Sequence, residues 1–251
     1  MKTNNIPFLI LFAGLLLANL GFNSCKENHI HGPGKSTVEI RQLERFNSIV
    51  VFDDIELHMR FGSFETPRAE ITGGENLIPF VLTEVENGVL TISNKNKWNW
   101  IRNIEKSKTS ITIWTDSINH VLYSGVEPLV FDDTLHVKDF VFESKDGMGT
   151  ISLKLKTDSA IVILHTGSPD LYMFGESVHT QLYSNSHGML YALDFLSENV
   201  TVHSRATCDI YVSPKNTLGV TIEYLGNVYY TNTPRLLWVG ESNKGRLIKL
   251  D

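Results

Sequence analysis

The chain has 251 residues, of which 42% are hydrophobic and 20% are charged. This composition is typical of a globular protein and excludes a chain that is disordered throughout. The formal net charge is −6 and no long basic run is present. A nucleic-acid partner is therefore excluded, because such a protein must neutralise phosphates.

Residues 1–24 are predicted to form a signal peptide. Lys2 supplies a positive charge, and residues 8–20 (FLILFAGLLLANL) form an apolar run that is too short to span a membrane. The following FNSC resembles the lipobox of bacterial lipoproteins, in which the cysteine is diacylated and becomes the new N-terminus. This resemblance implies lipidation of Cys25 and an outer-membrane lipoprotein that faces the periplasm or the cell surface. The alternative is an ordinary secretory signal that is cleaved nearby.

The cysteine content agrees with lipidation. The chain holds two cysteines, Cys25 and Cys208, whereas an exported protein stabilised by disulfides would show more of them, in pairs. Cys208 lies in an alternating segment, TCDIYV, and we interpret it as a small core or turn residue rather than a nucleophile. A Cys25–Cys208 disulfide is the alternative, but it would join the leader to the folded body.

Residues 25–36 are predicted to be a lipid-attached tether, because the segment is polar, aperiodic and contains glycine and proline. His29 and His31 are only two ligands on a linker and do not predict a metal site. No metal and no cofactor is expected.

Residues 37–115 are predicted to be N-terminal strands that cap the rest of the fold. Apolar residues alternate in IELHM, and Asn87-Gly88 separates two alternating runs, VLTEV and VLTIS. Asn-Gly is a hairpin signal because both residues tolerate positive φ. These two runs are therefore expected to pair.

Residues 94–108 interrupt the alternation with charges and with Trp98 and Trp100. The segment is expected to be a long loop or a short helix at an exposed edge. The two indoles are a candidate ligand-binding cluster. The alternative is that the loop folds back and covers the core.

Residues 116–251 carry a repeat of about 20 residues. Every twentieth residue from position 122 is apolar: Leu122, Phe142, Val162, Leu182, Val202 and Ile222. A turn rich in Gly, Ser, Asn and Asp and a second strand follow each position, and the leucine-rich repeat pattern is absent. The period predicts an all-β protein built as a β-solenoid, similar to a β-helix, whose stacked coils bury a continuous core. RLLWVGESNKGRLIKL is expected to close it as a C-terminal capping hairpin.

Several of these segments resemble the successive turns of a known family. They are SGVEPLVFDD, GMGTISLKL, TGSPDLYMFG, SNSHGMLYALDF and GNVYYTNTP, and the earlier FNSIVVFDDIELHMRFG and NGVLTIS fit the same pattern. Over residues 40–235 they are similar to the head GIN domain family of auto-transporter adhesins, which is common in Bacteroidetes. Glycines that are common at the family's turns are replaced by Lys145, Asn185, Arg205 and Thr207. The resemblance implies a lipid-anchored β-helical envelope protein, and the family supplies no catalytic residues.

The acidic residues do not form a catalytic pattern. Residues 53–54 and 132–133 are sequential Asp pairs, whose side chains would point to opposite faces of a strand. Asp170 and Asp209 follow equivalent turns, and we interpret them as caps of backbone N–H groups. The histidines share no phase of the repeat, and GxSxG, P-loop and calcium-nonapeptide motifs are absent.

Tyrosines concentrate in the solenoid. They are Tyr172, Tyr183, Tyr191, Tyr211, Tyr224, Tyr229 and Tyr230. Tyr183 directly follows the apolar position 182 and should point outward. An outward tyrosine on a flat β face suits sugar stacking or a protein partner. The alternative is that these side chains cover strand edges.

The sequence therefore favours a non-enzymatic lipoprotein of the cell envelope that acts as an adhesin or binding module for a glycan or protein ligand. One alternative is a polysaccharide-active β-helix protein or its inactive relative, which would need a groove of acidic residues in register. The other is a structural periplasmic protein, which would lack an exposed aromatic patch.

Overall fold

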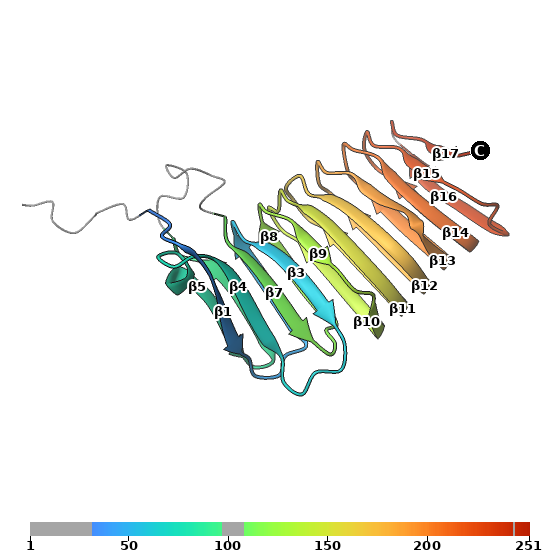
Figure 1. The fold of residues 1–251 in the computed structure, drawn as a ribbon. Helices are drawn as coiled ribbons and strands as arrows, with labels where there is room; N and C mark the ends of the chain where they lie inside the picture. The colour runs from blue at the N-terminus through green and yellow to red at the C-terminus, as the bar shows by residue number, and fades with distance from the viewer. Residues whose placement is uncertain (1–31, 97–107, 243) are drawn as a thin grey trace, which may run out of the picture. The chain divides into compact units, whose positions relative to one another are not determined.

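The computed structural model describes residues 32–96, 108–242 and 244–251 (Figure 1). The predicted signal peptide, the lipidation site Cys25 and the tryptophan pair of residues 94–108 lie outside these ranges. Those three predictions stay predictions.

Strands make up almost all of the secondary structure, and within the described residues a short 3₁₀ helix, η2 (Ile78–Phe80), is the one helical element. Among the residues that the structure describes, seventeen strands join in one sheet that winds around itself. In this part of the chain, helices of the length and apolarity needed to cross a membrane are not found.

The first seven strands lie before the regular coils. They are β1 (Ser36–Gln42), β2 (Ser48–Asp53), β3 (Glu56–Phe61), β4 (Arg68–Gly74), β5 (Val81–Glu86), β6 (Val89–Asn94) and β7 (Ser110–Thr115). The other ten include the long strands. They are β8 (His120–Gly125), β9 (Leu129–Phe131), β10 (Leu135–Ser144), β11 (Thr150–Leu164), β12 (Asp170–Ser184), β13 (Leu190–Ser204), β14 (Ile210–Ile222), β15 (Val228–Tyr230), β16 (Leu236–Ser242) and β17 (Leu247–Lys249).

The long strands β10 to β14 stack in parallel and form the regular coils (Figure 1). Phe142 of β10 is in register with Val162 of β11, and the same row continues through Leu182 of β12 and Val202 of β13. All four side chains are buried. The predicted all-β solenoid with about 20 residues per coil is therefore confirmed.

Two members of the predicted inward series, Leu122 and Ile222, do not belong to this row. The partner of Phe142 is Val121, which leaves Leu122 half-buried on the outer surface. At the other end Val220 takes the place in the row, and Ile222 is buried one inward position further on. The reason is coil length, because the first of these coils is one residue longer than the repeat and the last is two residues shorter.

Each long strand turns a corner near its middle. In β11 the buried side chains alternate up to Thr157 and then resume, shifted by one residue, at Ala160. Since side chains on a strand alternate with a period of two, this shift marks the corner. Hydroxyl groups fill the inside of the corner in the next coils, where Ser177 lies 2.6 Å from Thr180 and both lie 2.9 Å from Ser197. These polar groups satisfy one another in the interior.

The first coils are stacked out of sequence order. β2 lies between β6 and β8 and pairs in parallel with both, and β3 lies in the same way between β7 and β9. The coil built from β2 and β3 is thus inserted between two coils that come later in the chain. Parallel coils therefore extend into residues 37–115, the range that was predicted to hold capping strands. The side chains of β2 alternate as those of the later strands do, and Ile49 and Val51 point into the core and are buried.

Antiparallel strands close the N-terminal end. β5 and β6 form the predicted hairpin, and its turn residues Asn87 and Gly88 have φ values of 52° and 77°. β4 pairs antiparallel with β7, and β1 pairs antiparallel with β4. The carbonyl of Pro33 accepts a hydrogen bond from the N–H of Asn76 at 3.2 Å, which places the entry of the chain at this end.

The C-terminal segment forms a last partial coil and not the predicted hairpin. β16 pairs in parallel with β14, and β17 pairs in parallel with β15. Leu237 of β16 continues the buried row of Leu218, so the apolar alternation favours a further coil over a strand folded back on itself. β16 and β17 lie at the end of the stack opposite to β1 (Figure 1).

Candidate functional site

Four consecutive coils place a tyrosine at the same position on the outer surface. Tyr172 of β12 is in register with Tyr191 of β13, followed by Tyr211 of β14 and Tyr229 of β15. The ring centroids are 4.9, 5.0 and 4.8 Å apart, and the ring planes differ by 10°, 13° and 10°. We call these four residues the tyrosine row.

The strand register alone creates this row. Adjacent strands lie about 4.8 Å apart, so identical side chains at one register position stack face to face. The residue before each tyrosine is apolar and buried: Leu171, Leu190, Ile210 and Val228. The tyrosines must therefore point outward. Each stacked pair contributes about 0.5–1.5 kcal/mol beyond its burial.

Stacking decides which atoms the tyrosine row presents to a ligand. A ring between two neighbours has both faces covered, so its edge and its hydroxyl group remain accessible. All four residues are half-buried. At the β12 end the register continues with Ser152, whose short side chain cannot cover the outer face of the Tyr172 ring. The row therefore combines a line of phenol edges with one terminal ring face.

Residues two positions before the tyrosines border the row. Asp170 accepts a hydrogen bond from the N–H of Met189 at 2.9 Å, and Asp209 accepts one from the N–H of Asn227 at 2.8 Å. Both aspartates cap the backbone of the next coil, which confirms the prediction from the sequence. The Tyr191 hydroxyl donates to the sulfur of Met189 at 2.6 Å.

The surroundings raise the pKa of the two central phenols, those of Tyr191 and Tyr211. Partial desolvation raises the pKa of Tyr191 above its usual value, and the nearby Tyr172, Asp170 and Asp209 raise it further. Desolvation and then Asp209 raise the pKa of Tyr211 in the same way. A protonated phenol donates a hydrogen bond. The Tyr211 hydroxyl is therefore a donor near Asp209, whereas the Tyr191 hydroxyl already donates to Met189.

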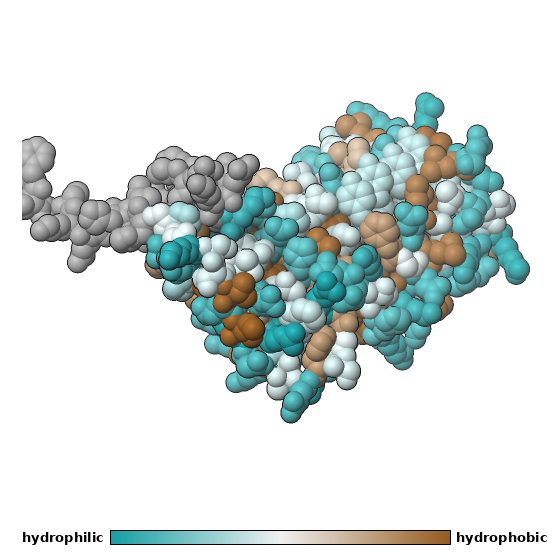
Figure 2. Space-filling view, viewed as in Figure 1, coloured by the Kyte–Doolittle hydropathy of each residue, from teal (hydrophilic) through white to brown (hydrophobic). Residues whose placement is uncertain are grey.

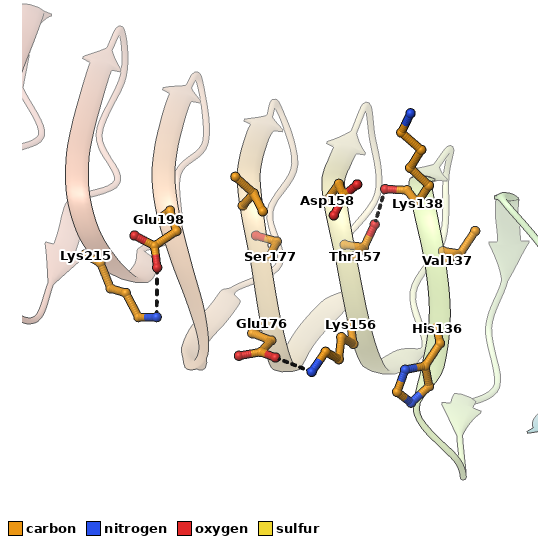
Figure 3. A pocket seen from close by; sticks show the side chains of 11 residues that line it. His136, Val137, Lys138, Lys156, Thr157, Asp158, Glu176, Ser177, Glu198 and Lys215 are labelled. Carbon is orange, nitrogen blue, oxygen red and sulfur yellow. Dashed lines mark hydrogen bonds and ion pairs between the residues drawn. The ribbon is translucent and has the colours of Figure 1, made fainter.

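A groove crosses the long strands at their corner (Figure 3). Its volume is about 530 Å³, and side chains from β10 to β14 line it. Val137, Thr157 and Ser177 form one register line across these strands. The groove therefore runs along the stack, and an extended ligand could lie in it in the same direction.

The charges in the groove neutralise one another. Lys156 lies 2.8 Å from Glu176, and Lys215 lies 2.9 Å from Glu198, as Figure 3 shows. The hydrogen bond with Lys156 lowers the pKa of Glu176, and the same contact raises the pKa of Lys156. A general acid needs a raised carboxyl pKa. Glu176 is therefore unsuited to that role.

A second charged cluster joins one carboxylate to two imidazoles. The Glu143 carboxylate lies 2.8 Å from His165 Nε2 and 3.1 Å from His120 Nε2, and His120 Nδ1 lies 3.0 Å from the Ser48 hydroxyl. The hydrogen bond with His165 lowers the pKa of Glu143 most, and His120 lowers it further. The cluster links β2, β8, β10 and the turn that follows β11. Among the described residues, no group of three or more His, Cys, Asp or Glu side chains could hold a metal ion.

The remaining acidic candidates make structural contacts. Asp53 accepts a hydrogen bond from the N–H of Asn94 at 3.0 Å. Asp132 lies 3.2 Å from His58 and 3.3 Å from Arg60. These contacts join neighbouring coils and leave the two carboxylates engaged.

Of the binding residues predicted from the sequence, Tyr183 is described, and it lies apart from the tyrosine row. Tyr183 is half-buried on the second half of β12, and its ring meets that of His203 edge to face at a centroid distance of 5.3 Å. Trp98, Trp100 and Cys25 fall outside the described residues. Their roles in binding and anchoring stay predictions.

The tyrosines can be found in the sequence, but their common register cannot be read from their spacing. Tyr172, Tyr191, Tyr211 and Tyr229 are not evenly spaced, so a fixed step of 20 residues does not connect them. Their local pattern is constant, because each follows a turn and one apolar residue in the segments DLY, MLY, DIY and NVY. Aligning the turns instead of counting residues would reveal the row.

A β-solenoid with repeated outward side chains is the class of protein that these observations define. Residues 45–234 match the model of the family described as "Putative auto-transporter adhesin, head GIN domain". The chain belongs to this family, as its segments indicated.

Solved structures share the fold. A "putative adhesin" from Bacteroides fragilis has a TM-score of 0.80 and 17% identity, over 88% of this chain and 100% of that chain. A "putative lipid binding protein" from Parabacteroides distasonis has a TM-score of 0.63 and 17% identity, over 89% and 100%. A "putative adhesin" from the same species has a TM-score of 0.64 and 19% identity, over 89% and 100%. The comparison with curated proteins gives no match.

Proposed function

We propose that the protein is a non-enzymatic adhesin of the cell envelope, held at the outer membrane by a lipid on Cys25, and that it binds a glycan chain along the tyrosine row. The observation that carries this proposal is the stacking of Tyr172, Tyr191, Tyr211 and Tyr229 in consecutive coils. The adhesin family of the chain supports the class of function.

The repeat of the surface favours a repeating ligand. The tyrosine rings recur every 4.8–5.0 Å, so a polymer can make the same weak contact several times, and the contacts reinforce one another. A glycan chain offers hydroxyl groups that accept hydrogen bonds from phenols, and a C–H surface that can pack on the open ring face of Tyr172. Figure 2 shows hydrophobic residues on the face in view as separate patches among hydrophilic ones, which suits a polar ligand better than a large apolar one.

The state of the acidic residues supports a role without catalysis. Asp170 and Asp209, beside the tyrosine row, accept backbone hydrogen bonds. Glu176 and Glu198, in the groove, are paired with lysines. Glycoside hydrolysis needs two carboxyl groups of which one has a raised pKa. Incubation with a bound glycan should therefore release no shorter products.

Glycan binding is tested by removing two neighbouring rings. The double variant Tyr191→Ala/Tyr211→Ala should bind at least about tenfold more weakly in a glycan array followed by titration, because it interrupts the row at its centre. Tyr183→Ala is the matched control and should bind as the original chain does. Equal binding by the double variant would contradict the proposal, and so would binding to proteins but to no glycan. Circular dichroism must show that each variant is folded.

The anchor is tested in cells. Cys25→Ser should abolish labelling with a fatty acid and move the protein from the membrane fraction to the soluble fraction, whereas Cys208→Ser should change neither. Protease treatment of intact cells, with lysed cells as the control, tests the exposure of the domain. A domain that is cut only after lysis faces the periplasm, and the adhesin proposal then fails.

A further inference from the structure

The two ends of the tyrosine row differ. At the C-terminal end Ile248 of β17 is in register with Tyr229, so a branched side chain follows the last ring. At the other end the register continues with the short side chain of Ser152 on β11. Within the described part of the chain, Tyr191 is the one aromatic ring or cation that stacks on Tyr172. The stack can therefore be extended at the Tyr172 end.

Outward side chains surround the position over Ser152. Outward residues on a strand are two positions apart, so Phe174 lies beside Tyr172 on β12, and Lys154 lies beside Ser152 on β11. Lys154 and Phe174 are in register with each other. On the side away from β12, Val130 of β9 is in register with Ser152. Two aromatic side chains, a short hydroxyl residue and a cation therefore occupy neighbouring positions.

Lys154 has a fixed position and a free charge. Its Nζ donates to the backbone carbonyl of Asp132 at 2.9 Å. The Asp132 carboxylate is held from β3, at 3.2 Å by His58 and at 3.3 Å by Arg60. Among the described residues, Lys154 forms no ion pair with a carboxylate. An ammonium group has three donors, so two donors of Lys154 remain for a ligand.

We infer that Tyr172, Ser152 and Lys154 form the end subsite of the tyrosine row, and that this subsite binds a sugar residue that carries a carboxylate. The inference rests on the proposed glycan function and specifies the ligand. The sugar ring lies over Ser152, where the next ring of the stack would be, about 4.8 Å from Tyr172. Its C–H face packs on the phenol ring. Its carboxylate accepts a charge-assisted hydrogen bond from Lys154.

The orientation of the rings selects the end of a glycan chain. The tyrosine rings stack face to face along the row, so a sugar that packs on Tyr172 turns one edge towards Ser152 and the opposite edge towards solvent. The edge that faces the strand cannot carry a further sugar. The bound residue is therefore at a chain end or on a branch. Lys154 lies about 7 Å further along β11, within reach of a carboxylate on the sugar ring, as in a uronic acid.

Filling the position over Ser152 tests the end subsite. Ser152→Tyr adds a fifth ring to the stack and occupies the place of the sugar. Gln181→Tyr is the matched control, because it adds the same ring at an exposed position of β12. In titrations of the full chain with an oligosaccharide that ends in glucuronate, Ser152→Tyr should bind at least about tenfold more weakly than the original chain. Gln181→Tyr should bind as the original chain does, and circular dichroism checks that both variants are folded.

Equal binding by Ser152→Tyr and the original chain overturns the end subsite. The glycan function of the row is tested separately, by Tyr191→Ala/Tyr211→Ala. Loss of binding in that double variant together with full binding by Ser152→Tyr would contradict the end subsite alone. An original chain that binds no glycan would contradict both proposals.

Removing the charge of Lys154 tests the carboxylate. The original chain should bind the glucuronate-ended oligosaccharide at least about fivefold more tightly than the same oligosaccharide ending in glucose. Lys154→Met should bind the two with equal affinity. Lys35→Met, which removes an exposed charge just before β1, should keep the preference. Equal binding of both oligosaccharides by the original chain overturns the inference, and so does a preference that Lys154→Met retains.

Discussion

Gly175 shows how closely neighbouring coils approach at single residues. It has a φ of +110°, and a Cβ at this position would lie 2.0 Å from the carbonyl oxygen of Leu155 in the preceding coil. Only glycine adopts this conformation without strain, and only glycine fits the space. The backbone irregularity between β12 and β13 begins after Tyr172 and ends at this residue.

Gly175→Ala should therefore lower the free energy of unfolding by about 1–3 kcal/mol or more. Gly219→Ala is the matched control. There a Cβ would meet its nearest neighbour, a ring carbon of Trp238, at an ordinary 3.6 Å. Urea unfolding of both variants measures the difference. Equal stability of the two would show that strand β12 can relax away from Leu155.

Glu143 makes stability depend on pH in the acidic range. Its hydrogen bonds with His165 and His120 hold the pKa of its carboxyl group below 4.5 in the folded state. A lowered folded-state pKa means that the stabilisation is present above the ordinary carboxyl value and is lost as the pH falls through the lowered one. Glu143→Gln should therefore be less stable than the original chain near about pH 6, and this difference should shrink towards about pH 3.

Urea unfolding across this pH range checks the prediction for Glu143. Glu84→Gln removes the same charge from an exposed position on β5 and should show no such convergence. A stability difference for Glu143→Gln that is the same at both ends of the range would mean that the cluster contributes by packing alone.

At the scale of single strands, β8 allows two possible registers to be compared, one with Leu122 inward and one with Val121 inward. The fixed 20-residue period points Leu122 inward, whereas the structure buries Val121 and pairs it with Phe142. Val121→Asn should cost about 2–4 kcal/mol, because it places an amide in the core. Leu122→Asn should cost about 1 kcal/mol or less, because the side chain faces outward. Thermal unfolding followed by circular dichroism compares them, and the reverse order of stability would restore the fixed period.

The same strands show what the sequence can predict about this fold. The row of Phe142, Val162, Leu182 and Val202 follows from the sequence, because these coils keep a length of 20 residues. A fixed step fails where a coil gains or loses residues, and it then loses Val121, Val220 and the tyrosine row. Between β12 and β15 the turns keep five residues, and the changes are register shifts inside the strands. Local alternation reports which side chains point inward. It does not report how many residues each coil uses.

Partner choice is the other feature that local patterns cannot supply. Apolar and polar side chains alternate along β2 as they would in an edge strand or in an inner strand. Its residues therefore do not predict that β6 and β8 flank it. The hairpin of β5 and β6 was predictable because Asn87-Gly88 specifies it locally. For β16 the segment length suited a hairpin, but packing of Leu237 on the row of Leu218 favours a parallel coil.

For the molecule as a whole, stability should decline towards the C-terminal end. β11, β12 and β13 are paired on both sides, whereas in the described chain β16 and β17 are paired on one side. Hydrogen exchange should show the slowest exchange in β11–β13 and the fastest in β16 and β17. Uniform protection of all coils would instead show that the solenoid opens only in one global step.

The insertion of β2 and β3 between later coils also governs the order in which a nascent chain can fold. β2 and β3 emerge early, directly after β1, but their pairing is complete only once β8 and β9 have been made, and β9 ends at Phe131, about halfway along the chain. Until then the first half has unpaired apolar strands and depends most on chaperones during synthesis and export. After that point each new coil can dock on a finished one, so the second half can fold vectorially, at the pace at which the ribosome or the export channel releases it.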